Sequence, residues 1–591
     1  MSFTAPVQAM PNNEKTTSKE MGNDTALQPT QSIDDASLIE LQENKNGQFH
    51  RSFTPRQVHV SEGVLNAPSE CTETAYKIIS LGSNIGSGLF IATGKALATA
   101  GPGNMVIAYL MVCSCVWGVL QSLSEMTIAF PVSGNYIDYA DRWVDPALAF
   151  GAGFAEWLGW TAIVAAEAGF FNVLIQFWAE GSFPQAATIT IFLVACLVIF
   201  LLPNTVFAWF EYVTSLIKIF LFLLIITLSL ALVFGAGPNG TFHHGETWTE
   251  HPAFLNGFAV GACYHIAYHS SLHYQGFANA ALLATWAVGD QVFIGIIGGE
   301  AQSPRFSMAH ATKLVPFRVN FIYMISIVFI TILVPSTDDR LLGGSGVAAS
   351  PFVIAIQDSG IPAIASILNA GMMCGVLAIA AESVYISSRV LRTMAHQKLI
   401  PERFAKVDDK GRPRWALIIT AVVAAFLGYI QLSSGGLEAL SWLISITSAS
   451  YFSNWIIIAF TNWRFHRALK AQNDPLFDQV YAWKSSAWPL APGWLMLISL
   501  LLLVCCFAAG INPVGGAGFT AYNFFQYMIG VLLIVGFTIG YKLIFRMPWR
   551  DPRTADLKTG RRHLGIEEIN QLDEYYKMSK WRRFGTYIQL W

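Results

Sequence analysis

The chain has 591 residues, of which 53% are hydrophobic and only 13% are charged. A soluble globular chain usually carries about a quarter charged residues, so this composition is typical of a protein surrounded by lipid. The formal net charge is −2, which excludes a strongly basic surface for nucleic acid.

Residues 1–74 are rich in Asn, Ser, Thr, Gln and Glu and contain no apolar core of a signal peptide. Such a segment cannot bury enough apolar surface to fold, so we expect a disordered N-terminal tail. Its lysines, Lys15, Lys19 and Lys45, are candidate targets of ubiquitin ligases.

Residues 75–545 contain repeated apolar runs of about 20 residues, each long enough to cross roughly 30 Å of hydrocarbon. They predict an all-α integral membrane domain with about twelve transmembrane helices. Residues 546–591 follow as a C-terminal tail, for which we expect a solvated segment. The expected spans are 76–98, 104–129, 147–178, 186–202, 212–234, 277–299, 317–335, 362–387, 415–432, 437–460, 490–509 and 523–545.

Lysine and arginine are concentrated in one set of alternate loops, most densely from Arg389 to Arg414. The opposite loops hold little beyond Lys95 and Arg340. By the positive-inside rule the basic loops are cytosolic, and an even number of spans places both tails on the same side.

The first expected span contains Gly82, Gly86 and Gly88. Each glycine lowers helix stability by roughly 1 kcal/mol relative to alanine, and the amides freed in lipid need partners. Two interpretations are open from the residues alone. The helix is broken and its N–H groups hold a substrate carboxylate, or the small residues allow close helix packing.

Five segments, in this order, resemble the fungal amino acid permeases of the amino acid/polyamine/organocation superfamily. The resemblance implies the fold of the bacterial leucine transporter, in which five helices are repeated in inverted orientation, followed by two C-terminal helices. The segments are GSNIGSGLFIATGKALATAGP, LQSLSEMTIAFPVSGNYIDYADRWVDPALAF, GGEAQSPRFSM, SRVLRTMAHQKLIPERFAKVDDKGRP and SNWIIIAFTNWRFHRA.

The resemblance also implies a substrate site at two broken helices. The substrate ammonium faces carbonyls freed in the sixth span, in the segment that contains Trp286, Ala287, Gly289 and Asp290. The substrate carboxylate is received by backbone groups of the first span, at Ser83, Asn84, Gly86, Ser87 and Gly88.

The sixth span departs from the family's usual Phe-Ser-Phe-Ser/Ala-Gly-Thr-Glu pattern, because Asp290 stands where the family has glycine. Asp290 could pair directly with a substrate cation, or it could be a helix-terminal or water-facing carboxylate. Trp286 is either an aromatic gate beside the site or a bulky lipid-facing residue.

Two charged residues inside expected spans are candidates for proton coupling. Lys218 matches a lysine of the fifth span in these permeases, and the resemblance implies that its protonation helps to close the site. The alternative is a side chain that snorkels to the interface. For Glu125 the resemblance leaves both structural pairing and proton movement open.

Residues 260–275 interrupt the resemblance as an insertion. His265, His269 and His273 share one helix face, which could indicate a metal or proton-sensing stripe. We favour a retained short intron, because valine codons begin with GT and one glutamine codon is CAG. We therefore expect no metal site.

These features predict a secondary active transporter that imports amino acids, with a proton, by alternating access around the first and sixth spans. No GxxxxGK[ST] phosphate loop occurs, so the proton gradient is the expected energy source and no cofactor is expected. We expect a plasma-membrane protein that is not an enzyme. The alternative is a nutrient-sensing receptor of the same fold with little or no transport.

Overall fold

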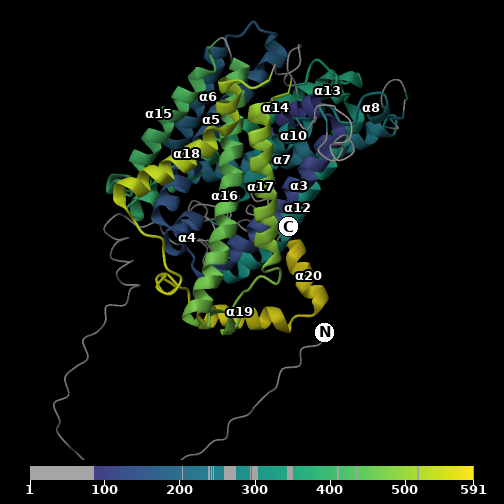
Figure 1. Ribbon diagram of the computed structural model, residues 1–591. Coiled ribbons are helices and arrows are strands. Elements are labelled where there is room, and N and C mark those ends of the chain that lie inside the picture. The colour runs from purple at the N-terminus through teal and green to yellow at the C-terminus, as the bar shows by residue number, and fades with distance from the viewer. Residues whose placement is uncertain are drawn as a thin grey trace, which may run out of the picture.

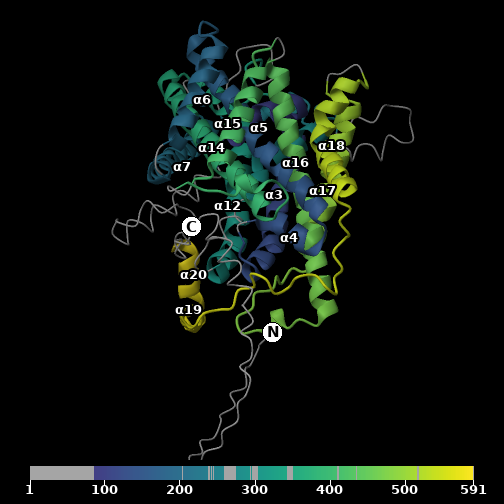
Figure 2. The ribbon, with the colours of Figure 1, turned by 90° about the vertical axis from the view of Figure 1, so that its left-hand side faces the viewer.

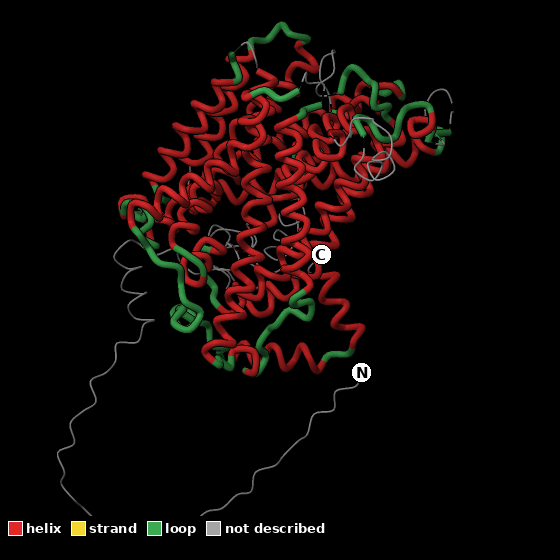
Figure 3. The backbone as a smooth tube through the Cα atoms, in the orientation of Figure 1, coloured by secondary structure: helices red, strands yellow, loops and turns green. Residues whose placement is uncertain are grey.

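The computed structural model describes residues 85–132, 134–201, 204–236, 240, 242–243, 245–257, 275–292, 295, 304–341, 350–408, 412–433, 436–514 and 518–589. Within these ranges the chain forms helices joined by turns and loops, and no strand occurs there (Figure 3).

The longest helices are α3 (Thr93–Ala129), α5 (Pro146–Ala179), α7 (Asn204–Val233), α12 (Pro304–Leu333), α14 (Pro362–His396), α16 (Gly436–Gln472), α17 (Leu490–Ile511) and α18 (Ala521–Phe545). The shorter ones are α4 (Asn135–Trp143), α6 (Gln185–Leu201), α8 (Glu246–Thr249), α10 (Gln275–Val288), α13 (Pro351–Asp358), α15 (Arg414–Ile430), α19 (Ile566–Lys577) and α20 (Lys580–Gln589). A π-helical turn, η2 (Gly88–Ala92), precedes α3, and the 3₁₀ turns are η4 (Gly289–Val292), η5 (Glu402–Phe404) and η6 (Leu476–Asp478).

In the described part of the chain, 8 helical stretches are long and apolar enough to cross a membrane, and α6 and α15 are shorter apolar helices. Large apolar side chains cover the outside of the bundle, which suits lipid rather than water as the surrounding medium. These helices confirm the all-helical membrane class. The number of twelve spans and the inverted repeat stay predictions. Examples of the exposed residues are Leu201, Phe220, Val422, Phe426 and Leu543.

The first two expected spans are two helical segments that meet at a break within α3. Gly101 adopts φ 78° and ψ 168° inside α3, directly before Pro102. A side chain at Gly101 would be strained by this φ, and its Cβ would lie 2.9 Å from the Ala253 carbonyl oxygen. The Gly103 amide donates to that same oxygen at 2.8 Å, so the break also anchors the loop before α10.

The long helices pack as one bundle (Figures 1 and 2). α5 packs against α14, α16 and α18, whereas α3 packs against α10 and α12. The two irregular turns η2 and η4 both lie against α3 and α10. This packing brings η2, within the first expected span, next to the interruption of the sixth.

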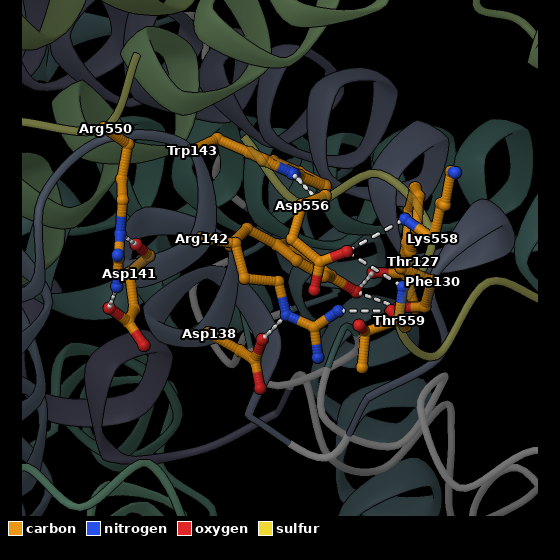
Figure 4. Close-up of polar contacts among 11 residues, drawn as sticks. Thr127, Phe130, Asp138, Asp141, Arg142, Trp143, Arg550, Asp556, Lys558 and Thr559 are labelled. Atoms are coloured by element: carbon orange, nitrogen blue, oxygen red, sulfur yellow. Dashed lines mark hydrogen bonds and ion pairs between the residues drawn. The ribbon is translucent and has the colours of Figure 1, made fainter. Parts of the chain in front are cut away.

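The C-terminal segment folds back onto the end of the bundle where α4 lies (Figure 4). The Arg142 guanidinium donates to the Thr559 carbonyl at 2.6 Å, and the Trp143 indole donates to the Asp556 carbonyl at 2.9 Å. The described residues 546–589 therefore contact the bundle, although many of their side chains are exposed, and a cytosolic tail stays a prediction. Loops and helix ends of the bundle supply polar partners for this segment.

Candidate substrate site

The first span begins irregularly in the structure. Ile85 and Gly86 precede the helix, and the Gly86 carbonyl accepts hydrogen bonds from the amides of Leu89 at 3.0 Å and Phe90 at 2.9 Å. The π-helical turn η2 then widens the backbone before α3 continues. Of the predicted carboxylate-binding residues, Gly86, Ser87 and Gly88 lie at this start. Ser83 and Asn84 lie outside the described residues.

The glycines of this turn also allow close contacts with other helices. A Cβ on Gly88 would lie 2.7 Å from the Ala287 Cα atom, and one on Gly86 would lie 1.9 Å from Ile379 Cδ1. Close packing through small residues is therefore present together with the irregular backbone. The contact between Gly88 and Ala287 joins the two segments that were predicted to form the substrate site.

The sixth span is interrupted where the sequence predicted it. α10 ends at Val288, and η4 continues as a tighter 3₁₀ turn. The Tyr323 hydroxyl donates to the Ala287 carbonyl, and Gly289 packs on the ring of Tyr451. Tyr323 therefore satisfies one of the carbonyls at the end of α10, a role that sequence analysis did not assign.

Trp286 and Asp290 face the interior. Trp286 is 6% exposed, and its ring lies 5.3 Å from the ring of Phe170. The lipid-facing interpretation of Trp286 is therefore wrong. The half-buried Asp290 accepts a hydrogen bond from the Gln291 side chain. A role for either residue in substrate binding stays a prediction.

Lys218 is fully buried on α7, and its Nζ atom lies 3.8 Å from Glu211 Oε1. A Cβ on Gly375 of α14 would lie 3.7 Å from Lys218 Cγ and 3.9 Å from the ring of Phe90. The lysine therefore lies beside η2. Its ammonium does not reach an interface, so the snorkelling interpretation is wrong.

Sequence analysis missed three carboxylates near this site, of which Glu167 and Glu211 are buried and Glu382 is half-buried. Ser87 Oγ donates a hydrogen bond to Glu167 of α5, which is 1% exposed. Glu211 pairs with Lys218 on α7, and Glu382 lies on α14, which packs against α7. The sequence signal was available, because Glu167, Glu211 and Glu382 all stand inside or at the edge of apolar runs.

Glu125 belongs to a different cluster. Its carboxylate accepts hydrogen bonds from the Ser485 amide at 3.0 Å, from Asn462 at 3.0 Å and from His466 at 2.8 Å. These bonds join α3, α16 and the loop before α17. Structural pairing accounts for this geometry, and a part in proton movement stays a prediction.

The histidine stripe of the insertion lies outside the described residues, which resume at Gln275. Elsewhere, the described chain contains no group of three or more His, Cys, Asp or Glu side chains that could hold a metal ion. The buried cysteines of the described spans are free thiols.

The apolar helices, with charged groups buried between them, define an integral membrane protein. Residues 76–551 match the family profile of amino acid permeases. The chain is 31% identical to amino-acid permease GAP5 of Candida albicans, over 87% of this chain and 80% of that protein. It is 28% identical to general amino-acid permease GAP1 of Saccharomyces cerevisiae, over 84% of this chain and 80% of that protein. It is 29% identical to the basic amino-acid permease of the same yeast, over 88% of this chain and 89% of that protein.

The chain belongs to the amino acid permease family. Permeases are transporters and not enzymes, so the predicted family, the membrane location and the absence of an enzymatic role are confirmed.

Proposed function

We propose that this protein imports an amino acid together with a proton, by alternating access around its first and sixth spans. The observation that carries the proposal is the contact of Gly88 with Ala287, beside the buried Lys218. Two irregular helical segments that contact each other leave backbone groups that a zwitterion can satisfy.

In this mechanism the substrate carboxylate binds at the start of η2. The first amides of a helix have no intrahelical partners, and the helix dipole favours negative charge there. The substrate ammonium faces the turn after α10, where the Asp290 carboxylate adds attraction for a cation. Trp286 then encloses the side chain of the amino acid from the α10 side.

Lys218 supplies the proton coupling. When protonated, its ammonium is stabilised by Glu211 and holds η2 against α14 through the contacts around Gly375. When deprotonated, it releases this attraction and η2 can separate from α7 and α14. Proton loss to the inner side would then allow the bundle to return without substrate.

Uptake of a panel of labelled amino acids, in cells that lack their own permeases, tests the proposal. Uptake of the preferred substrate should be several-fold higher at pH 5 than at pH 7.5 and should fall with a proton uncoupler. Lys218→Met should lower uptake at least about tenfold and remove its pH dependence. Asp290→Asn should raise KM more than it lowers maximal uptake.

The matched control is Lys470→Met, which removes an exposed lysine of α16. Surface expression is measured for every variant. Wild-type uptake that ignores both pH and the uncoupler rules out proton coupling. Ligand-dependent signalling with negligible uptake identifies a nutrient sensor instead.

We further propose that the protein resides in the plasma membrane with both tails in the cytosol, where ubiquitin ligases could reach Lys15, Lys19 and Lys45. The basic loops support this orientation. Epitope tags at each terminus should be accessible to antibody only after permeabilisation. A tag that is accessible in intact cells contradicts the orientation.

A further inference from the structure

A pocket of about 410 Å³ lies between the start of α12, the loop before α17, and helices α19 and α20. The pocket is walled by the same C-terminal helices that lie under the bundle in Figures 1 and 2. Pockets of roughly 300–1,000 Å³ are of the size that holds a small ligand or a headgroup.

The lining of this pocket is strongly basic. Arg305 and Lys313 reach it from α12, and Lys580 and Arg583 reach it from α20. No carboxylate is among the described lining residues. Positively charged side chains gathered around one hollow attract anions, so the lining favours a multiply charged anion.

Buried, hydrogen-bonded side chains form part of the pocket wall, whereas Lys313 and Lys580 are exposed. Arg305 is 7% exposed, and its Nε donates to the Tyr481 carbonyl at 2.6 Å. His310 Nε2 lies 3.2 Å from the Tyr575 hydroxyl, and the two rings are 5.2 Å apart. A guanidinium held in place keeps its fork of N–H donors oriented for phosphate oxygens.

An apolar surface begins directly beside the pocket. Lys313, Phe317 and Phe321 follow one another at intervals of four residues, so they share one face of α12. Phe317 is 61% exposed and Phe321 is 45% exposed on the part of α12 that enters the membrane. A ligand with a charged head in the pocket could therefore extend its apolar part along this face.

We propose that this pocket binds the phosphorylated headgroup of an anionic phospholipid, with the acyl chains lying on α12 along Phe317 and Phe321. Basic pockets beside transmembrane helices on the cytosolic side recognise phosphoinositide headgroups by the same chemistry. The site joins α12 to the C-terminal helices, so lipid occupancy would hold α19 and α20 against the bundle.

The test measures binding of short-chain phosphatidylinositol phosphate to the purified full-length protein in neutral detergent. Lys580→Gln with Arg583→Gln removes two charges from the pocket. The control, Lys577→Gln with Arg582→Gln, removes two exposed charges from the same two neighbouring helices outside the lining. Circular dichroism spectra confirm that both double variants remain folded.

We expect the pocket variant to raise Kd at least about tenfold and the control variant to raise it less than about threefold. Phosphatidylcholine of the same chain length should not compete. Equal weakening by both variants, or the absence of saturable binding, overturns the site. If the free inositol phosphate binds as tightly as the lipid, the ligand is a soluble phosphate and the lipid assignment is wrong. Binding is measured without transport, so its failure is distinct from failure of the proposed uptake.

Discussion

At the scale of single residues, Glu125 offers a direct distinction between a structural and a proton-carrying carboxylate. It is 1% exposed and accepts three hydrogen bonds from groups on α16 and the loop before α17. Glu125→Gln should destabilise the protein by about 2 kcal/mol, because hydrogen bonds to a charged group are stronger than those to an amide. Thermal unfolding of the purified protein in detergent measures this change.

The matched variant is Glu438→Gln on α16, whose carboxylate is exposed and accepts one hydrogen bond, from Tyr522. Its unfolding temperature should change little. For Glu125→Gln, the pH dependence of uptake should be retained in the protein that remains folded. An unfolding temperature that does not move, with a shifted pH profile of uptake, contradicts structural pairing.

The identity of the buried charges could be predicted from the sequence, but their partners could not. A carboxylate in an apolar run is costly in lipid, and this signal marks Glu167 and Glu382 as well as Glu125. The partner of Glu167 is Ser87, 80 residues earlier in the chain. Such a pair depends on which helices pack together, and no local spacing encodes it.

At the scale of elements, the crossing of η2 and α10 depends on the absence of a side chain at Gly88. Gly88→Ala places a methyl group 2.7 Å from the Ala287 Cα atom, so one of the two backbones must shift. Overpacking of this kind costs about 1–3 kcal/mol. We expect uptake to fall at least about tenfold, because the two segments that bind substrate are displaced.

Gly536→Ala in α18 is the control, since nothing lies within 4 Å of a Cβ at that position. Uptake by this variant should match wild type at equal surface expression. Normal uptake by Gly88→Ala would show that the close crossing is not required, and it would weaken the proposed substrate site.

The last carbonyls of a second element, α6, accept hydrogen bonds from an arginine in a loop far away in the chain. Arg412 donates to the carbonyls of Phe200 at 3.2 Å and Leu201 at 3.1 Å, which are among the last of that helix. Asp408 positions this guanidinium through two side-chain hydrogen bonds, at 3.1 and 2.9 Å. The loop between α14 and α15 therefore holds the end of α6.

This contact makes stability depend on pH. Burial alone would raise the pKa of Asp408, but hydrogen bonds from the amide and side chain of Arg412 and from Arg414 outweigh it and lower that pKa below 3.8. A lowered pKa stabilises the folded protein above pH 3.8, and this contribution is lost as pH falls through the folded value. Asp408→Asn should therefore cost about 1 kcal/mol at pH 7 and much less near pH 3.

Unfolding temperatures of both proteins at pH 7, 5 and 3 measure this difference. The exposed Asp339→Asn serves as the control, and its effect should be small at each pH. A difference between wild type and Asp408→Asn that does not shrink as the pH falls would contradict the role given to the carboxylate.

Helix positions were predictable because lipid sets the length of each apolar run, and the expected spans overlap helices wherever the structure describes them. The composition also indicated the irregular, glycine-rich backbone before α3 and the interruption near Gly289. The contact that fills the break at Gly101 was not indicated, because the loop around Ala253 that makes it lies far along the chain, before α10.

At the scale of the whole molecule, residues 550–562 of the C-terminal segment, called the belt below, pack against one end of the bundle. The Arg550 guanidinium donates to the Asp141 carbonyl at 2.9 Å, and the Arg562 amide donates to the Ala129 carbonyl at 3.0 Å. The polar composition of this segment predicted solvation. The structure adds contacts with donors more than 400 residues earlier, the side chains of Arg142 and Trp143, which no composition can indicate.

Arg142 makes one of the contacts that dock this belt, and its own bonds make it suitable for a test (Figure 4). Its guanidinium bonds Asp138 on its own helix and the Thr559 carbonyl on the belt. Arg142→Gln should cost about 1.5–3 kcal/mol of local stability, since charge-assisted bonds to both groups are lost. Amide hydrogen exchange in residues 556–562 should then accelerate at least about tenfold, while exchange in α5 and α16 stays unchanged.

Arg553→Gln provides the control, because it removes an exposed arginine of the same segment. Its exchange pattern should match wild type. If Arg142→Gln accelerates exchange equally in the belt and in α5, the residue stabilises the bundle as a whole. If it leaves residues 556–562 protected, the remaining contacts of Trp143 and Arg562 hold the belt without it. Acceleration confined to the belt is the only result consistent with a C-terminal segment that undocks as a unit while the transmembrane helices stay packed.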